Sequence, residues 1–249
     1  MDDSDVTVIR VLCIHGFRQT ALQLKGRTRA LEKRLRQYVR DHSNGRYRCE
    51  LVFDVEGPHA LPHIVAKDGG DVVGSKPRRA WLVTKEQYNH IDDGAWVHNP
   101  NQFLMQTEGW RESLDVLDGH LDRHGPFDCI LGFSQGAAVA GYLAVRESAR
   151  PSVQRRFKSV IIISGYVLAM LKELKVKNVP AMLPSLHVYG GDDKDCQVPK
   201  DCSLELAGHF DESTRSLLQT DSGHLIPSSR EYVAEIGHFL LQHCASISN

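Results

Sequence analysis

Short, almost wholly apolar runs alternate along this chain with longer segments whose apolar residues recur every three or four positions. The short runs are typical of strands buried on both faces of a parallel sheet, and the longer segments are typical of amphipathic helices. The alternation predicts an α/β fold with a mostly parallel central sheet of about six strands and helices on both faces. The predicted strands lie at 6–14, 47–55, 129–131, 159–164, 186–189 and 214–219, and the predicted helices at 20–42, 103–121, 202–210 and 229–244, with one more directly after Ser134.

One long segment, at about 57–103, interrupts the alternation. It is rich in Gly, Pro and Asp, and only 79–83 has the pattern of an ordered element. Loops of this length in a compact domain are usually functional or disordered. Two interpretations stay open, a partial lid that forms one wall of an acyl pocket, or a surface excursion held by one or two aromatic side chains. The apolar residues expected to line such a pocket are Trp81, Trp96, Phe103 and Met105.

Length and composition limit the kind of protein. A chain of 249 residues is compatible with a single α/β domain over 1–249, and its formal net charge of −1 gives no indication of nucleic-acid binding. The acidic N-terminus lacks the basic region of a signal peptide, and no segment has the apolar length of a membrane span. The six cysteines are scattered without metal-site spacing, which favours reduced thiols and a cytoplasmic location.

The segment 20–42 has a strongly basic face. Such a face could dock on anionic lipid, but it is more often only solvated, and we interpret it as a solvated surface. Its members are Lys25, Arg27, Arg29, Lys33, Arg34, Arg36 and Arg40.

The most informative motif lies where an apolar strand turns into a helix. Residues 132–136 read Gly-Phe-Ser-Gln-Gly. In this context a Gly-x-Ser-x-Gly sequence is typical of a turn that exposes the serine Oγ above the sheet edge, with glycines where a Cβ would clash. The N–H groups of the following helix favour negative charge beside the serine. We predict that Ser134 is a nucleophile; the alternative is a tight turn whose serine caps the helix.

The end of the first strand is a candidate for half of an oxyanion hole. In hydrolases with this arrangement of the nucleophile, one donor comes from a strand-to-helix loop and the other from the residue after the serine. We therefore predict the backbone amides of Phe17 and Gln135 as donors. His15, which precedes Gly16 and Phe17, is interpreted as a histidine that packs the loop rather than as a catalytic group.

An acid and a base are expected after later strands, in the order serine, acid, histidine. Asp192, Asp193 and Asp195 follow the penultimate strand, where at least two of them are expected to serve only as turn or cap residues. His224 follows the last strand in the sequence Ser-Gly-His-Leu-Ile-Pro. A lone histidine among 13 would mean little, but this one completes an ordered serine, aspartate and histidine set.

Taken together, these motifs resemble the family serine hydrolases of the α/β-hydrolase superfamily, a family that includes fungal FSH-type proteins and the ovarian-cancer-gene esterases of animals. The resemblance runs over nearly the whole chain, through VLCIHGFRQT, EGPH, RAWLV, PFDCILGFSQGAA, SLHVYGGDD and SGHLIP. It implies a single-domain α/β-hydrolase fold. It also implies that Ser134 is the nucleophile, His224 the base and Phe17 one oxyanion donor.

The resemblance leaves two aspartates as candidates for the acid. Counting from Gly190 selects Asp193, whereas counting back from Pro199 selects Asp195, because the intervening segment is about two residues longer here than in the family pattern. We predict Asp193, with Asp195 as the alternative.

The function that the resemblance implies is that of a serine carboxylesterase, which hydrolyses small-molecule acyl esters through an acyl-enzyme intermediate without a metal or organic cofactor. Apolar residues at 57–103 suggest a longer acyl chain. An acyl thioesterase or a lipid hydrolase would use the same groups. A ligand-binding protein on the same scaffold is a further alternative, which the complete Ser134, Asp193 and His224 set disfavours.

Overall fold

The computed structural model describes residues 6–61, 78–84, 102–174, 180–191 and 194–245. Asp192, Asp193, Trp96 and most of the predicted lid at 57–103 lie outside these residues.

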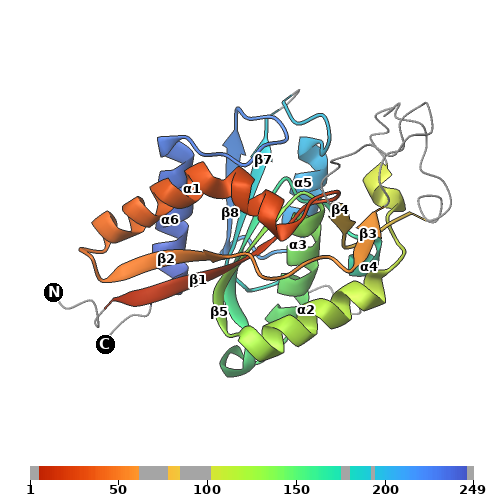
Figure 1. Ribbon diagram of the computed structural model, residues 1–249, viewed down its shortest axis with the longest axis horizontal. Coiled ribbons are helices and arrows are strands. Elements are labelled where there is room, and N and C mark those ends of the chain that lie inside the picture. Colours follow the sequence, from red (N-terminus) through yellow and green to blue (C-terminus); the bar gives the residue numbers. More distant parts are fainter. Residues whose placement is uncertain (1–5, 62–77, 85–101, 175–179, 192–193, 246–249) are drawn as a thin grey trace.

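Six parallel strands form the central sheet, as the apolar runs predicted (Figure 1). Their chain order differs from their spatial order, which is β2, β1, β5, β6, β7, β8. The strands are β1 (Thr7–Ile14), β2 (Tyr47–Val52), β5 (Phe127–Phe133), β6 (Phe157–Ile163), β7 (Ser185–Gly190) and β8 (Arg215–Thr220).

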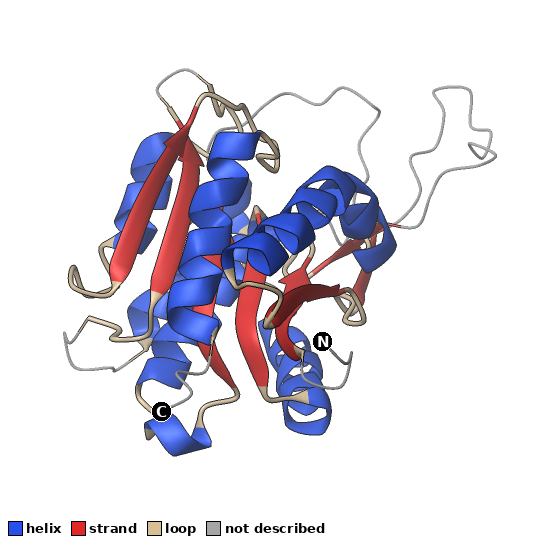
Figure 2. Cartoon of the chain, turned by 90° about the vertical axis from the view of Figure 1, so that its left-hand side faces the viewer, coloured by secondary structure: helices blue, strands red, loops and turns tan. Residues whose placement is uncertain are grey.

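Helices cover both faces of the sheet, and each face has its own apolar core (Figure 2). One core joins the sheet to α1 (Ala21–His42) and α6 (Arg230–Cys244). The other joins it to α2 (Trp110–His124), α3 (Gln135–Ser148), α4 (Ala169–Glu173) and α5 (Lys200–Ala207). This three-layer arrangement confirms the predicted fold class.

The order in which the chain adds strands to the sheet reverses between β1 and β5. The chain enters the sheet at β1, adds β2 on one side and then continues with β5 on the other side of β1. Ile14 pairs with Gly132, so the ends of the two strands lie level. In open α/β sheets, ligands bind outside the carboxyl ends of the strands at such a reversal of strand order.

Outside the sheet, β3 (His59–Leu61) and β4 (Arg78–Ala80) form an antiparallel pair. Gln19 also bridges to Arg79, which connects this pair to the loop after β1.

The helix predicted from residue 103 begins later than expected. A 3-10 turn, η3 (Gln102–Met105), comes first, and α2 starts only after Gly109, whose φ of 76° is left-handed. Since glycine adopts this conformation without strain, it allows the chain to change direction before the helix. The apolar spacing at 103–105 therefore reflects packing, such as that of Phe103 on Tyr166, and not a helix.

β1 begins, and α6 ends, at the amino edge of the parallel sheet, away from the carboxyl ends of the strands. None of the helices in the described parts of the chain is long and apolar enough to span a bilayer.

Candidate active site

Ser134 stands at the junction of β5 and α3, in the strained turn that the motif predicted. Its φ of 56° and ψ of −120° are rarely adopted by a residue with a side chain. Its amide donates to the carbonyl of Ile163 at 2.9 Å, and its carbonyl accepts the amide of Ala138 at 3.0 Å. These bonds to β6 and α3 hold the turn in place.

The two glycines of the motif have a steric role. A Cβ at Gly132 would collide with the carbonyl oxygen of Gly136, and a Cβ at Gly136 would collide with that of Ile14. Strand, turn and helix therefore approach more closely than any other residue would allow.

The structure brings His224 to Ser134. Nε2 of His224 lies 2.9 Å from Oγ of Ser134, although 90 residues separate them in the chain. Nδ1 lies 2.9 Å from Oδ2 and 3.1 Å from Oδ1 of Asp195. An ionised carboxylate only accepts hydrogen bonds, so Nδ1 carries the proton and Nε2 is left to accept the hydroxyl of the serine.

The carboxylate beside His224 is thus that of Asp195, the alternative to Asp193 in the sequence analysis. Asp193 lies outside the described residues. Counting back from Pro199 selects the aspartate that contacts His224, whereas counting from Gly190 selects Asp193.

Asp195 is held as an anion by its neighbours. Burial disfavours its charged form, but hydrogen bonds from His224 and from the Val198 amide, together with the His224 charge and a hydrogen bond from Ser164, outweigh burial and lower the pKa of this carboxyl. Oδ1 also accepts the amides of Gln197 at 3.0 Å and Val198 at 2.9 Å. The acid is therefore charged and oriented at neutral pH.

The loop after β1 passes directly over the turn at Ser134. A Cβ on Gly16 would lie 3.1 Å from the carbonyl oxygen of Phe133, and the Gly16 amide donates to Oε1 of Gln19 at 3.1 Å. Phe17 follows and lines the same pocket as Ser134. The amide of Gln135 belongs to the first turn of α3, where N–H groups have no partner within the helix.

His15 packs the loop, as its interpretation from the sequence anticipated. Its Nε2 accepts the Gly57 amide at 2.9 Å, and its Nδ1 bonds the carbonyl of Gly16 at 2.9 Å. Burial, with a smaller contribution from the charge of Arg79, lowers the pKa of His15 to about 4 against the opposing effect of the hydrogen bond to Gly16, so the ring is neutral.

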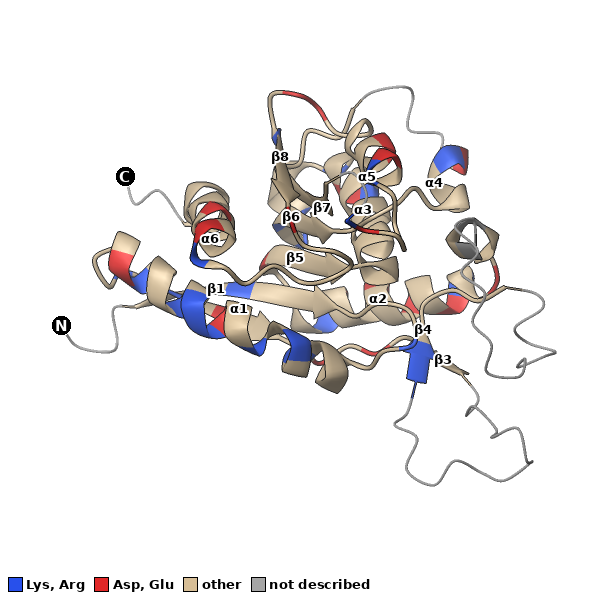
Figure 3. Ribbon diagram, turned by 90° about the horizontal axis from the view of Figure 1, so that it is seen from above, with Lys and Arg blue, Asp and Glu red and all other residues tan. Residues whose placement is uncertain are grey.

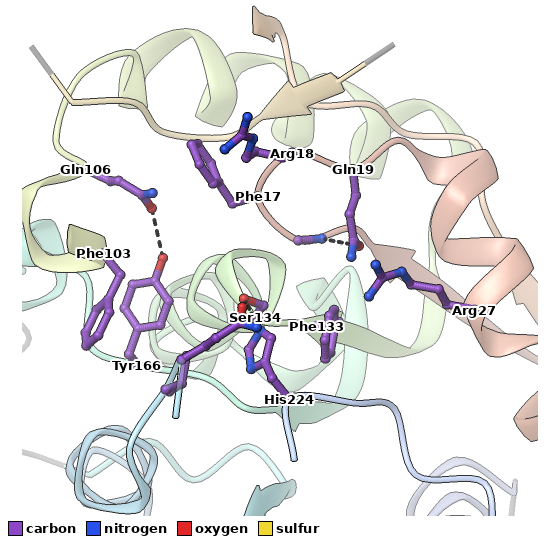
Figure 4. Close-up of a pocket in the computed structure, with 13 residues that line it drawn as sticks. Phe17, Arg18, Gln19, Arg27, Phe103, Gln106, Phe133, Ser134, Tyr166 and His224 are labelled. Carbon is purple, nitrogen blue, oxygen red and sulfur yellow. Dashed lines mark hydrogen bonds between the residues drawn. The ribbon is translucent and has the colours of Figure 1, made fainter. Parts of the chain in front are cut away.

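The side chain of Gln135 has a role that the sequence did not indicate. It is fully buried, its Oε1 accepts the Trp81 amide at 2.8 Å, and its Nε2 donates to the Leu82 carbonyl at 2.8 Å and to Oε1 of Gln106 at 2.6 Å. Tyr166 donates to the same oxygen of Gln106 at 3.1 Å (Figure 4). The motif contains Gln135, but only the fold shows which distant backbone groups it contacts.

A pocket of about 270 Å³ opens above Ser134. Phe103 and Tyr166 lie on one side of the serine, and Gln19 and Arg27 lie on the other (Figure 4). Of the four residues expected as apolar lining, Phe103 is confirmed. Trp81 is fully buried in the core with its Nε1 donating to the His15 carbonyl at 2.8 Å, Met105 is not part of this pocket wall, and Trp96 lies outside the described residues.

Among the residues that the structure describes, no cluster of His, Cys, Asp or Glu has the arrangement of a metal centre.

Known proteins with similar sequences include named esterases. Residues 4–236 match the family described as Serine hydrolase (FSH1). The Esterase OVCA2 of Danio rerio is 30% identical over 240 residues, which cover 93% of this chain and 96% of that protein. The Rhodanese-like domain-containing protein 6 of Arabidopsis thaliana is 35% identical over 240 residues, or 94% of this chain, but the match spans only 39% of that longer protein.

Solved structures agree on the fold. The crystal structure of esterase PE8 superposes with a TM-score of 0.58, at 21% identity, over 95% of this chain and 93% of that one.

Proposed function

The chain belongs to the FSH1 serine hydrolase family and is a hydrolase of the esterase type, and from this we propose that it is a carboxylesterase that cleaves acyl esters at Ser134. The observation that carries the proposal is the continuous contact from Ser134 through His224 to Asp195, with heavy-atom distances of 2.9 Å at both steps. We propose Asp195, rather than Asp193, as the acid.

Acylation begins with a proton transfer. His224 takes the hydroxyl proton as Oγ of Ser134 bonds to the ester carbonyl carbon, and Asp195 stabilises the resulting imidazolium. The carbonyl oxygen becomes an oxyanion, for which the amides of Phe17 and Gln135 are the proposed donors. Collapse of this intermediate breaks the bond to the alkoxide, which takes the proton from His224 and leaves as the alcohol.

Deacylation repeats these steps with water. His224 removes a proton from water, the hydroxide bonds to the acyl carbon, and the second tetrahedral intermediate expels Oγ of Ser134. The serine recovers its proton from His224 and the carboxylic acid departs. Phe103 and Tyr166 give the pocket an apolar wall, which supports an acyl substituent of some length.

The test uses a fluorophosphonate, which reacts with activated serines, and intact-mass spectrometry. We expect one adduct on the wild type and none on Ser134→Ala, with ester hydrolysis by the variant reduced about 10⁴-fold or more. Ser152→Ala is the control, because this serine is exposed in the 3-10 turn Ser152–Gln154 and is not part of the proton-transfer chain; the variant should still be labelled. A folded wild type without an adduct, or full activity in Ser134→Ala, would refute the proposal.

A further inference from the structure

The wall of the pocket opposite Phe103 and Tyr166 is cationic. The guanidinium of Arg27 is directed from α1 toward Gln19 and Phe133 (Figure 4). Arg18, the residue directly after Phe17, also lines this pocket. Ser134 therefore lies between an apolar side and a positively charged side.

The charge continues beyond the pocket. A groove of about 1140 Å³ shares Arg18, Gln19 and Arg27 with the pocket, and its wall also contains Arg78 and Arg79 from β4. In Figure 3 the basic residues of α1 and of β4 lie along the same side of the molecule. We call Arg18, Arg27, Arg78 and Arg79 the arginine cluster.

Few acidic groups lie beside Arg27 in the part of the chain that the structure describes. Among the described residues that line the pocket and the groove, Glu56 is the one carboxylate. Its Oε1 accepts the amide of Ala21 at 3.0 Å, and its Oε2 lies 3.5 Å from Nε2 of His15. Arg27 forms no ion pair with any residue that the structure describes. Glu56 is thus engaged at the start of α1, where it contacts the Ala21 amide and His15.

The protein holds this cluster together at a cost. Arg18 has a left-handed φ of 59°, which is unfavourable for a residue with a side chain. Burial, and then the charge of Arg78, lower the pKa of Arg18. Like charges are brought together beside a reactive group when a ligand supplies the opposite charge, and guanidinium groups suit carboxylate and phosphate oxygens because they bind them in pairs.

We propose that the preferred substrate is an ester with one apolar half and one half that carries an anionic oxyacid group, a carboxylate or a phosphate, which Arg27 binds. The apolar half then lies against Phe103 and Tyr166, and Ser134 attacks the bond between the halves. This inference rests on the proposed esterase function and names the class of substrate for it.

The test compares esters that differ in charge alone. The para-(carboxymethyl)phenyl and para-(phosphonomethyl)phenyl esters of octanoic acid are compared with the neutral para-(carbamoylmethyl)phenyl ester. Because the methylene group separates the charge from the ring, the three leaving groups have similar acidity. We expect kcat/KM for an anionic ester to exceed that for the neutral ester by about tenfold, since a charge-assisted hydrogen bond contributes about 1.5–3 kcal/mol. The carboxylate and phosphonate esters distinguish the two kinds of anion.

Variants of Arg27 test whether the arginine cluster causes the preference for anionic esters. Arg27→Leu should reduce the ratio of anionic to neutral kcat/KM severalfold, and Arg27→Glu should bring it below one. Arg29 is exposed on the same helix and lines neither the pocket nor the groove. Arg29→Leu and Arg29→Glu should therefore leave the ratio unchanged. The wild-type preference should also fall as salt is raised from 0.05 to 0.5 M, because salt screens exposed charges, with a Debye length of about 10 Å at 0.1 M.

Failure of this inference differs from failure of the esterase function. Hydrolysis of the neutral ester without any preference for anions, or a preference that Arg27→Glu does not alter, would overturn the arginine assignment and leave the esterase intact. If no ester is cleaved, the inference can still be tested by binding. Calorimetry then compares the affinity of the protein for the uncleavable para-(carboxymethyl)phenyl octyl ether with its affinity for the amide analogue of this ether. Tighter binding of the acid, lost in Arg27→Glu, supports the inference, and equal binding refutes it.

Discussion

At the scale of single residues, the site depends on a backbone conformation that the chain adopts only under constraint. A residue held in such a sparsely populated region costs about 1–3 kcal/mol, which the surrounding structure must offset. Ser134 is fixed there by its hydrogen bond to Ile163 and by the close approach of Gly136 to the end of β1. The same strained turn places Oγ of Ser134 2.9 Å from Nε2 of His224.

Replacing Gly136 with alanine tests this constraint. The new Cβ would collide with the carbonyl oxygens of Ile14 and His15, so we expect the free energy of unfolding in urea to fall by about 1–3 kcal/mol. Gly26 is the matched control, because it lies exposed in α1 with open space around it. Gly26→Ala should raise the free energy of unfolding by about 0.5–1 kcal/mol. Equal effects of the two variants would contradict the steric argument.

The choice between the two aspartates is tested by a pair of amide substitutions. Asp195→Asn removes the charge that supports the His224 imidazolium and permits the wrong tautomer, so kcat should fall about 10³–10⁴-fold. Asp193→Asn should leave kcat close to that of the wild type. Circular dichroism of both variants controls for folding. A large loss of kcat in Asp193→Asn, with Asp195→Asn still active, would restore Asp193 as the acid.

At the scale of elements, the site is assembled from the loops after β1, β5, β7 and β8. Parallel strands end at the same edge, so sequence motifs far apart in the chain were enough to predict that Ser134 and His224 meet. The sequence could not decide which aspartate joins them, because the loop after β7 is irregular and its length differs from the family pattern. The contacts of Gln135 were also unpredictable, since they depend on how segments without regular periodicity pack.

The Gln135 side chain should determine how firmly the segment after β4 is held. Gln135→Met removes Oε1, which accepts the Trp81 amide at 2.8 Å and the Leu82 amide at 3.4 Å, so we expect faster hydrogen exchange of both amides. Gln154→Met, at an exposed position in η4 (Ser152–Gln154), is the control and should not change this exchange. Unchanged protection of the two amides in Gln135→Met would show that other contacts hold the segment.

At the scale of the whole molecule, acid sensitivity follows from histidines that are buried in the neutral form. Burial, with a smaller contribution from the charge of Arg215, lowers the pKa of His187 to about 3. The unfolded chain has a histidine pKa of about 6.5, so between these values it binds more protons than the folded chain. The free energy of unfolding therefore falls as the pH drops below about 6.5.

This effect can be measured by urea unfolding at pH 7.5 and pH 5. We expect His187→Gln to reduce the loss of unfolding free energy between these values by about 2 kcal/mol, because glutamine does not titrate. His238 is exposed on α6, and His238→Gln should show the full wild-type loss. If His187→Gln lost as much stability as the wild type, buried neutral His187 would not be a cause of acid sensitivity.

The position of the chain ends has a practical consequence. β1 starts and α6 finishes at the amino edge of the sheet, whereas Ser134, His224 and Asp195 occupy the carboxyl edge. A reporter protein or a surface linker attached before β1 or after α6 would thus be separated from the entrance of the pocket by the length of the strands. The protein could be immobilised on a sensor chip by either terminus with its substrates still free to enter.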